Sequence, residues 1–141
     1  MKIILAVDGS PYTGKALMYL FAHRPTFVDG NELILVNACL GIPPHVSRHV
    51  SRELLDDYYR DEAAKVLDPV RAKLAELGID NYTTQARHGH AATEIIQAAR
   101  EAQAELIIMG TRGHRTLGRA LMGSVATQVV AEAHMSVLLV Q

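Results

Sequence analysis

The sequence predicts an α/β fold, a three-layer sandwich in which helices cover both faces of a five-stranded parallel sheet. Four apolar runs are almost unbroken, as expected for parallel strands buried on both faces: residues 3–7, 32–38, 105–110 and 136–140. Segments with a helical pattern separate these runs, so strands and helices alternate along the chain. With 141 residues, 49% of them hydrophobic, the chain has the size and apolar content of one domain spanning 1–141.

Local signals define the first elements. After the first strand come Ser10, a favourable N-cap, and Pro11, which fits the first helical position, so we expect a helix that runs toward His23. The strand over 32–38 follows. Residues 40–50 are rich in glycine and proline and form the one long irregular connection that we expect.

The second half of the chain continues the alternation. Across residues 51–77, apolar residues recur at steps of three, four or seven, which predicts one long amphipathic helix. Residues 81–89 alternate between polar and apolar and predict an edge strand. Helices over 91–104 and 124–134 complete the order, and each precedes an apolar strand. This arrangement favours a doubly wound parallel sheet.

Composition excludes several classes of function. The 14 basic and 15 acidic residues nearly balance, so bulk charge recruits neither nucleic acid nor an anionic membrane. No stretch approaches the roughly 20 apolar residues of a membrane span, and the opening apolar run is too short for a signal sequence. The single cysteine, Cys39, ends a buried strand and is interpreted as a small core residue. We therefore expect a cytoplasmic protein without an internal disulfide.

Two stretches contain the glycines that a phosphate site needs, and the first is rejected. Gly9, Gly14 and Lys15 fit GxxxxGK, the start of a P-loop, after the first strand. Ala16 stands where a P-loop carries the hydroxyl that binds magnesium. The helix start at Pro11 also places Gly14 and Lys15 inside helical turns, where N–H groups are bonded to backbone carbonyls. We therefore do not expect this pair to bind phosphate.

Asp8 is still a candidate site residue although the P-loop is rejected. It follows the first strand directly, at the edge where α/β sheets bind ligands. Two roles are equally well supported for it: a turn residue that caps the first helix, and a contact to a bound ligand.

The second stretch, residues 110–125, reads GTRGHRTLGRALMGSV and joins a buried strand to a helix. Gly110 and Gly113 allow the backbone to approach a ligand closely, and a helix N-terminus attracts anions. Hydroxyls at Thr111 and Ser124 lie near the two ends of this stretch, and it contains four basic residues: Arg112, His114, Arg115 and Arg119. We therefore predict a phosphate site here, in preference to a flexible connection with a solvated basic face.

The spacing Gly110, two residues, Gly113, nine residues, Gly123-Ser124 resembles the G-2x-G-9x-G(S/T) nucleotide motif of the universal stress protein family. KIILAVDGS, LILVNA, RHGHAATEII and SVLLV are also similar to that family, so the resemblance covers nearly the whole chain. It implies an adenine nucleotide alpha hydrolase-like fold with strand order 3-2-1-4-5, a site between strands 1 and 4, and a homodimer. The last strand is the expected dimer contact, because it lacks the charges that normally protect a sheet edge: Val137, Leu138, Leu139 and Val140.

The resemblance also implies a ligand and roles for individual residues. The complete motif accompanies ATP binding in that family, so the expected ligand is ATP, or ADP or AMP, with Mg²⁺ as a companion ion. The ribose and phosphates would be wrapped by Gly110, Thr111, Arg112 and Gly113, and the phosphate tail would be held by Gly123, Ser124 and Val125. Asp8 would lie near the nucleoside and is the candidate contact to nucleotide-bound metal. The backbones of Ala6 or Val7 and of Ala38 would meet the adenosine.

Three functions stay open at this point. The leading hypothesis is a stress or signalling protein that uses nucleotide as a regulatory or stabilising ligand. Little or no hydrolysis is expected, because no paired carboxylates lie near the glycine loop. A nucleotide-independent interaction module and a slow phosphoryl- or adenylyl-transfer enzyme are the alternatives. His45 with His49 and His88 with His90 lack further metal ligands nearby and are interpreted as surface residues.

Overall fold

The computed structural model describes residues 1–114 and 122–141. Its centre is an all-parallel five-stranded sheet in the order β3-β2-β1-β4-β5, which confirms the expected fold class and strand order. The strands lie where the apolar runs predicted them: β1 Lys2–Ala6, β2 Glu32–Cys39, β3 Tyr82–His88, β4 Leu106–Gly110 and β5 Ser136–Val140. The weakly alternating β3 is an edge strand, as predicted, because among the described strands it pairs with β2 alone.

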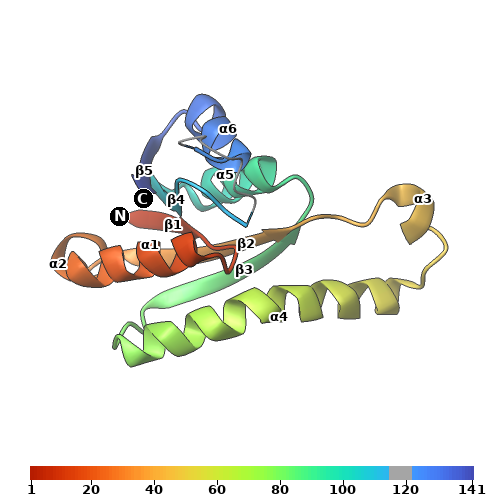
Figure 1. Ribbon diagram of the computed structural model, residues 1–141, viewed down its shortest axis with the longest axis horizontal. Coiled ribbons are helices and arrows are strands. Elements are labelled where there is room, and N and C mark those ends of the chain that lie inside the picture. The colour runs from red at the N-terminus through yellow and green to blue at the C-terminus, as the bar shows by residue number, and fades with distance from the viewer. Residues whose placement is uncertain (115–121) are drawn as a thin grey trace.

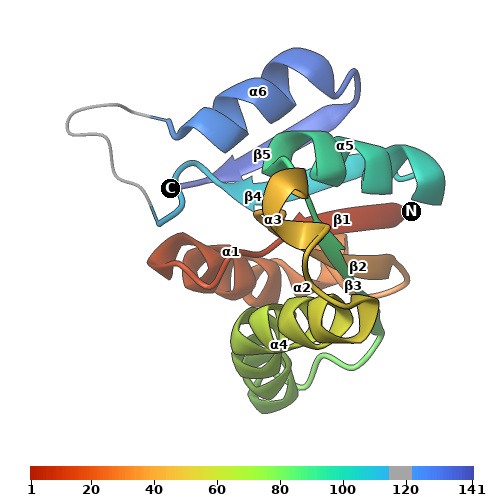
Figure 2. The ribbon, with the colours of Figure 1, turned by 90° about the vertical axis from the view of Figure 1, so that its right-hand side faces the viewer.

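Helices cover both faces of this sheet. One face carries α1 (Pro11–Ala22) and α4 (Arg52–Glu76), and the other carries α5 (Ala91–Ala102) and α6 (Ser124–Glu132), as Figure 2 shows. Two single-turn helices that the pattern did not predict lie in the connections: α2 (Arg24–Phe27) and α3 (Pro44–Ser47). Each has a proline in its first turn, where the missing N–H removes no helical hydrogen bond.

The two faces of the sheet have separate hydrophobic cores. Along β1, Ile3 and Leu5 pack with α1 and α4, whereas Ile4 between them packs with α5 and α6. Successive side chains of a strand point to opposite faces, so one unbroken apolar run supplies both cores. This explains why the central strands appeared in the sequence as continuous apolar runs. No helix in the described ranges is long and apolar enough to cross a membrane.

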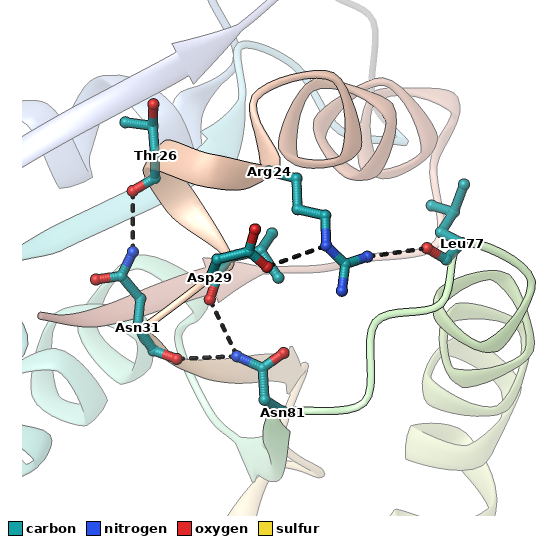
Figure 3. Close-up of polar contacts among 7 residues, drawn as sticks. Arg24, Thr26, Asp29, Asn31, Leu77 and Asn81 are labelled. Carbon is teal, nitrogen blue, oxygen red and sulfur yellow. Dashed lines mark hydrogen bonds and ion pairs between the residues drawn. The ribbon is translucent and has the colours of Figure 1, made fainter.

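Polar side chains close the amino end of the sheet (Figure 3). Asn81, just before β3, donates from Nδ2 to the carbonyls of Val28 and Asn31, both at 3.0 Å. Arg24 donates to the carbonyl of Leu77 at the end of α4, at 3.3 Å. These side chains bond backbone carbonyls of the loops before β2 and β3, and so connect the two loops. At the carboxyl end of the sheet, by contrast, there is a cavity.

The longest helix extends beyond the carboxyl ends of the strands (Figure 1). The 25 residues of α4 rise about 37 Å at 1.5 Å per residue, whereas the eight residues of β2 rise about 26 Å. Ser51 caps the projecting end, its Oγ accepting from the Leu54 N–H at 3.2 Å. The first half of α4 therefore lies beside the segment that leaves β2, at the same end of the sheet as the predicted site.

Candidate functional site

A cavity of about 370 Å³ opens at the carboxyl ends of β1 and β4. The chain leaves these two central strands in opposite directions across the sheet, β1 toward β2 and β4 toward β5, and α/β folds bind ligands at such a point. Ten of the eleven residues predicted for the site line this one cavity: Ala6, Val7, Asp8, Ala38, Gly110, Arg112, Gly113, Gly123, Ser124 and Val125. Thr111 is the exception.

Thr111 is buried next to the cavity and is not among its lining residues. Its side chain is buried, with 5% of the residue exposed. Its N–H donates to the carbonyl of Val140 in β5, and its carbonyl accepts from Gly123 N–H at 2.7 Å. Both backbone groups of Thr111 therefore join elements of the fold, and the Gly123 N–H is likewise already bonded.

The first turn of α6 presents amide groups to the cavity. Ser124, Val125 and Ala126 line it, and the N-cap position is Gly123, which has no side chain to bond these N–H groups. The first N–H groups of a helix have no partner inside the helix, and the helix dipole adds partial positive charge there. This end of the cavity is therefore suited to an anion.

Asp8 performs the capping role and still faces the cavity. Its Oδ1 accepts from Ser10 N–H at 2.9 Å and from Thr13 Oγ1 at 2.9 Å, which holds the turn into α1. The Oδ2 lies close to Gly113, where an added Cβ would be 2.5 Å from it, and both residues line the cavity. The capping role is thus seen in Oδ1, and the ligand contact of Asp8 stays a prediction.

Gly110 and Gly113 are needed by the protein's own contacts. A Cβ at Gly110 would lie 2.5 Å from Tyr12 Cβ, and one at Gly113 would lie 2.5 Å from Asp8 Oδ2. A larger residue at Gly110 must push β4 away from the start of α1, and one at Gly113 must displace the Asp8 carboxylate. The glycines were predicted because a ligand must approach the backbone closely. In the structure, Tyr12 of α1 and Asp8 also pack closely against the backbone of these glycines.

Two basic side chains of this loop lie at the cavity. Arg112 and His114 both line it, and the His114 Nε2 contacts the Asp8 carbonyl oxygen. A carbonyl only accepts hydrogen bonds, so in this contact the proton is on Nε2. Arg115 and Arg119, the other basic residues of the predicted cluster, fall outside the described residues.

The opposite half of the cavity is apolar. It is formed chiefly by Val36 of β2, Leu40 directly after β2, Met109 of β4, and Ala91 and Ile95 of α5. Sequence reasoning missed these five because each carries an apolar side chain that a core position would equally explain. Their one available signal was position, since Val36 and Met109 lie near the carboxyl ends of central strands. A cavity with an apolar half and an amide-lined half suits an amphipathic ligand, with a flat ring at one end and an anion at the other.

The first glycine pair is remote from this chemistry. Gly14 and Lys15 are the fourth and fifth residues of α1, are exposed, and are absent from the cavity lining in the described ranges. Lys15 Nζ lies over the Tyr12 ring, 4.9 Å from its centroid. The rejection of a P-loop at this position is consistent with both observations.

Cys39 ends β2 with an intermediate exposure. Burial raises the pKa of its thiol above the ordinary value, and the nearby Glu62 carboxylate adds to the increase. The protonated thiol is a poor nucleophile, in agreement with the interpretation of Cys39 as a packing residue. Within the part of the chain that the structure describes, no group of three His, Cys, Asp or Glu side chains is placed to hold a metal ion.

Curated proteins from other organisms are similar to this chain over nearly its whole length. A curated universal stress protein of Methanocaldococcus jannaschii is 32% identical over 143 residues, which cover 99% of this chain and 81% of that protein. One from Thermus aquaticus is 35% identical over 140 residues, covering 99% of this chain and 97% of that protein. Both relatives therefore match this chain over nearly its whole length.

Solved structures share the fold at lower identity. A universal stress protein from Lactobacillus plantarum superposes with a TM-score of 0.78 at 22% identity, covering 100% of this chain and 97% of that one. Another, solved in complex with cAMP, gives 0.74 at 21% identity, with 100% and 97% covered. A family member from Arabidopsis thaliana with AMP bound gives 0.66 at 19% identity, with 99% and 90% covered.

A family-wide model covers the whole chain as well. The model described as the universal stress protein family matches residues 1–141, from the first residue before β1 to the last after β5. Together with relatives above 30% identity over almost the full length, this match identifies the chain as a member of the universal stress protein family.

Proposed function

We propose that this chain binds an adenine nucleotide, ATP in preference to smaller forms, in the cavity between β1 and β4. One observation carries the proposal: ten of the eleven residues predicted for the site, from the glycine motif and from strand ends, line a single cavity that is apolar at one end and amide-lined at the other. The complexes of two structural neighbours with cAMP and AMP support the choice of an adenine nucleotide. The full G-2x-G-9x-G(S/T) spacing supports ATP.

In this proposal the nucleotide lies across the carboxyl ends of the strands. The adenine occupies the apolar half, next to the backbone of Ala38, and the ribose lies near Asp8. The phosphates extend between the Gly110–Gly113 backbone and the first turn of α6, where Ser124 and Val125 supply N–H groups. Arg112 adds a positive charge at the same end.

The bound nucleotide serves as a regulatory or stabilising ligand, and hydrolysis is slow or absent. Asp8 is the one acidic side chain among the described residues that line the cavity. Phosphoryl transfer by metal needs ions held in place, usually by more than one ligand, and a positioned nucleophile. Mg²⁺ would therefore arrive with the nucleotide and meet the free oxygen of Asp8. The cytoplasmic location stays a prediction from the sequence.

Calorimetric titration of the purified protein with ATP, ADP, AMP and cAMP, with and without Mg²⁺, tests the proposal. We expect saturable binding of ATP and release of phosphate no faster than the uncatalysed control. At a concentration of ATP 100 times its Kd, the free energy of unfolding should rise by about 2.7 kcal/mol. Absence of binding at millimolar nucleotide would leave the nucleotide-independent interaction module, and magnesium-dependent turnover would favour the enzyme.

Ala38→Leu localises the binding to this cavity. Ala38 lines the apolar half, so the added carbon atoms fill the space proposed for adenine, and ATP affinity should fall at least tenfold. Ala86→Leu is the matched control, because Ala86 is an exposed strand residue outside the cavity lining. Equal affinity in both variants would place the nucleotide elsewhere.

We also propose a homodimer through β5. This strand pairs with β4 along one side, and Val137, Leu138 and Leu139 are only partly buried within the single chain. An edge of this kind without charges favours pairing with a second copy. Light scattering should give twice the chain mass at micromolar concentration, and Val137→Lys should shift it toward the monomer. A monomeric wild-type protein would overturn this part of the proposal.

A further inference from the structure

The segment that leaves β2 forms the outer wall of the apolar half of the cavity. Leu40 lines the cavity although 79% of the residue is exposed, so its own burial does little to hold it there. Its position depends on the backbone on either side. The Cys39 carbonyl accepts from Gly89 N–H at 2.8 Å, and the Ile42 N–H donates to the Tyr59 hydroxyl at 3.0 Å. Leu40 is therefore held between two fixed points.

The second fixed point belongs to a different element. Tyr59 lies in the projecting half of α4, and its ring stacks on His88 at the end of β3, with centroids 3.9 Å apart and planes 5° from parallel. Neither ring lines the cavity. The stack orients the hydroxyl of Tyr59 toward the β2 exit, so α4 and β3 together determine where the chain goes after Cys39.

Gly41 lies between Leu40 and Ile42 and packs close to the Tyr59 hydroxyl that accepts from Ile42. A Cβ at Gly41 would lie 3.7 Å from Gly89 Cα and 4.0 Å from the Tyr59 hydroxyl oxygen, so the three groups are close neighbours. Beyond Ile42 the chain continues into exposed residues around α3. The Tyr59 hydroxyl therefore holds the last backbone group before an exposed connection.

We propose that Tyr59 is a positioning residue for the nucleobase: through Ile42 it holds Leu40 against the apolar half of the cavity, and the stack on His88 holds Tyr59. This inference rests on the proposed adenine-nucleotide site. Tyr59 acts on the base end of the ligand and leaves the phosphate end, which lies at the Gly110–Gly113 backbone and α6, unaffected.

Tyr59→Phe tests the inference because it removes the hydroxyl and keeps the ring that stacks on His88. Loss of one hydrogen bond of ordinary strength should weaken ATP binding about fivefold. The affinity for inorganic tripolyphosphate, which has no base, should not change. Tyr58→Phe is the matched control, since it removes a hydroxyl from the adjacent, exposed tyrosine and should bind ATP like the wild type.

A double-mutant cycle decides whether Tyr59 acts through Leu40. Leu40→Ala alone should weaken ATP binding, and the variant with both changes should bind no more weakly than the weaker single variant. His88→Ala should behave like Tyr59→Phe, whereas His88→Phe, which can still stack, should restore affinity.

Each outcome separates this inference from the function on which it rests. Three results would overturn the positioning role and leave the nucleotide site in place. Tyr59→Phe could bind ATP as tightly as the wild type, or lose affinity for ATP and tripolyphosphate equally. The fold-losses of ATP affinity in Tyr59→Phe and Leu40→Ala could also multiply in the double variant, as for independent residues. A wild-type protein that binds no ATP would remove the proposed function, and this inference with it.

Discussion

Two glycine-containing regions of this chain look alike in sequence and have opposite roles in the fold. Gly14 with Lys15 follows β1, and Gly110 with Gly113 belongs to the end of β4 and its loop. Both regions combine glycine with a basic residue after an apolar strand. Only the second lies in the lining of the cavity, as far as the described residues extend.

Backbone conformation accounts for the difference. Pro11 begins α1 three residues before Gly14, so the amides of this region belong to a helix and a side chain on Gly14 would meet nothing within 4 Å. After β4, the next helix within the described residues begins at Ser124. The backbone at Gly110 and Gly113 passes so close to Tyr12 and Asp8 that a Cβ at either glycine would lie 2.5 Å from one of them. The position of a glycine relative to the nearest helix start is therefore more informative than its spacing from a lysine.

Of the substitutions that test this comparison, Gly110→Ala should have the largest effect on stability. The added Cβ would meet Tyr12 Cβ at 2.5 Å and the Arg112 carbonyl oxygen at 3.2 Å, and neither belongs to the flexible end of a side chain. Overpacking of this kind should lower the free energy of unfolding by about 2–3 kcal/mol, measured by urea denaturation. A variant as stable as the wild type would show that α1 and β4 can separate without loss.

Gly113→Ala should act mainly on the ligand. Its Cβ would meet Asp8 Oδ2, and Asp8 can move only by weakening the hydrogen bonds of Oδ1 to Ser10 and Thr13. We expect ATP affinity to fall about tenfold, because the backbone cradle and Asp8 are displaced together, with a loss of stability of about 1 kcal/mol. Calorimetry and thermal melting separate the two effects, and unchanged affinity would exclude this loop from the site.

Asp8→Asn should have an intermediate effect whose sign depends on the ligand. The amide oxygen can still accept from Ser10 and Thr13, so the turn into α1 should survive. Removing the negative charge should tighten metal-free AMP and weaken the contribution of Mg²⁺ to ATP binding, each by about 1 kcal/mol or fivefold. Titrations with and without Mg²⁺ measure this. The same change for both ligands would mean that Asp8 has only its structural role.

Gly14→Ala should have the smallest effect, and in the opposite direction. Alanine is favoured over glycine inside a helix, and this position has open space around it, so stability should rise by about 0.5–1 kcal/mol. ATP affinity should equal that of the wild type. Lys15→Ala should also bind ATP normally. Loss of binding in either variant would revive the P-loop that the helix start at Pro11 argues against.

Much of the architecture was accessible from local pattern. Strand and helix positions agree within a few residues, because alternation, helical periodicity and the Ser10-Pro11 start are properties of neighbouring residues. The short helices α2 and α3 were missed because a single turn has too few residues for a periodic signal. The glycines were predicted from their spacing between a strand and a helix, and Asp8 from its position at a strand end. The spacing could not show that Thr111 is buried and that its backbone bonds Val140 and Gly123.

The order of the elements, the parallel sheet and the edge at which a ligand would bind were thus available from the residues in sequence, since each depends on periodicity along the chain. Folding decided the rest: the division of Asp8 between α1 and the cavity, the crowding of Gly110 by Tyr12, and the attachment of Leu40 to Tyr59 through Ile42. These contacts join segments from different elements, and steric and hydrogen-bonding demands between such segments leave no periodic trace in the sequence.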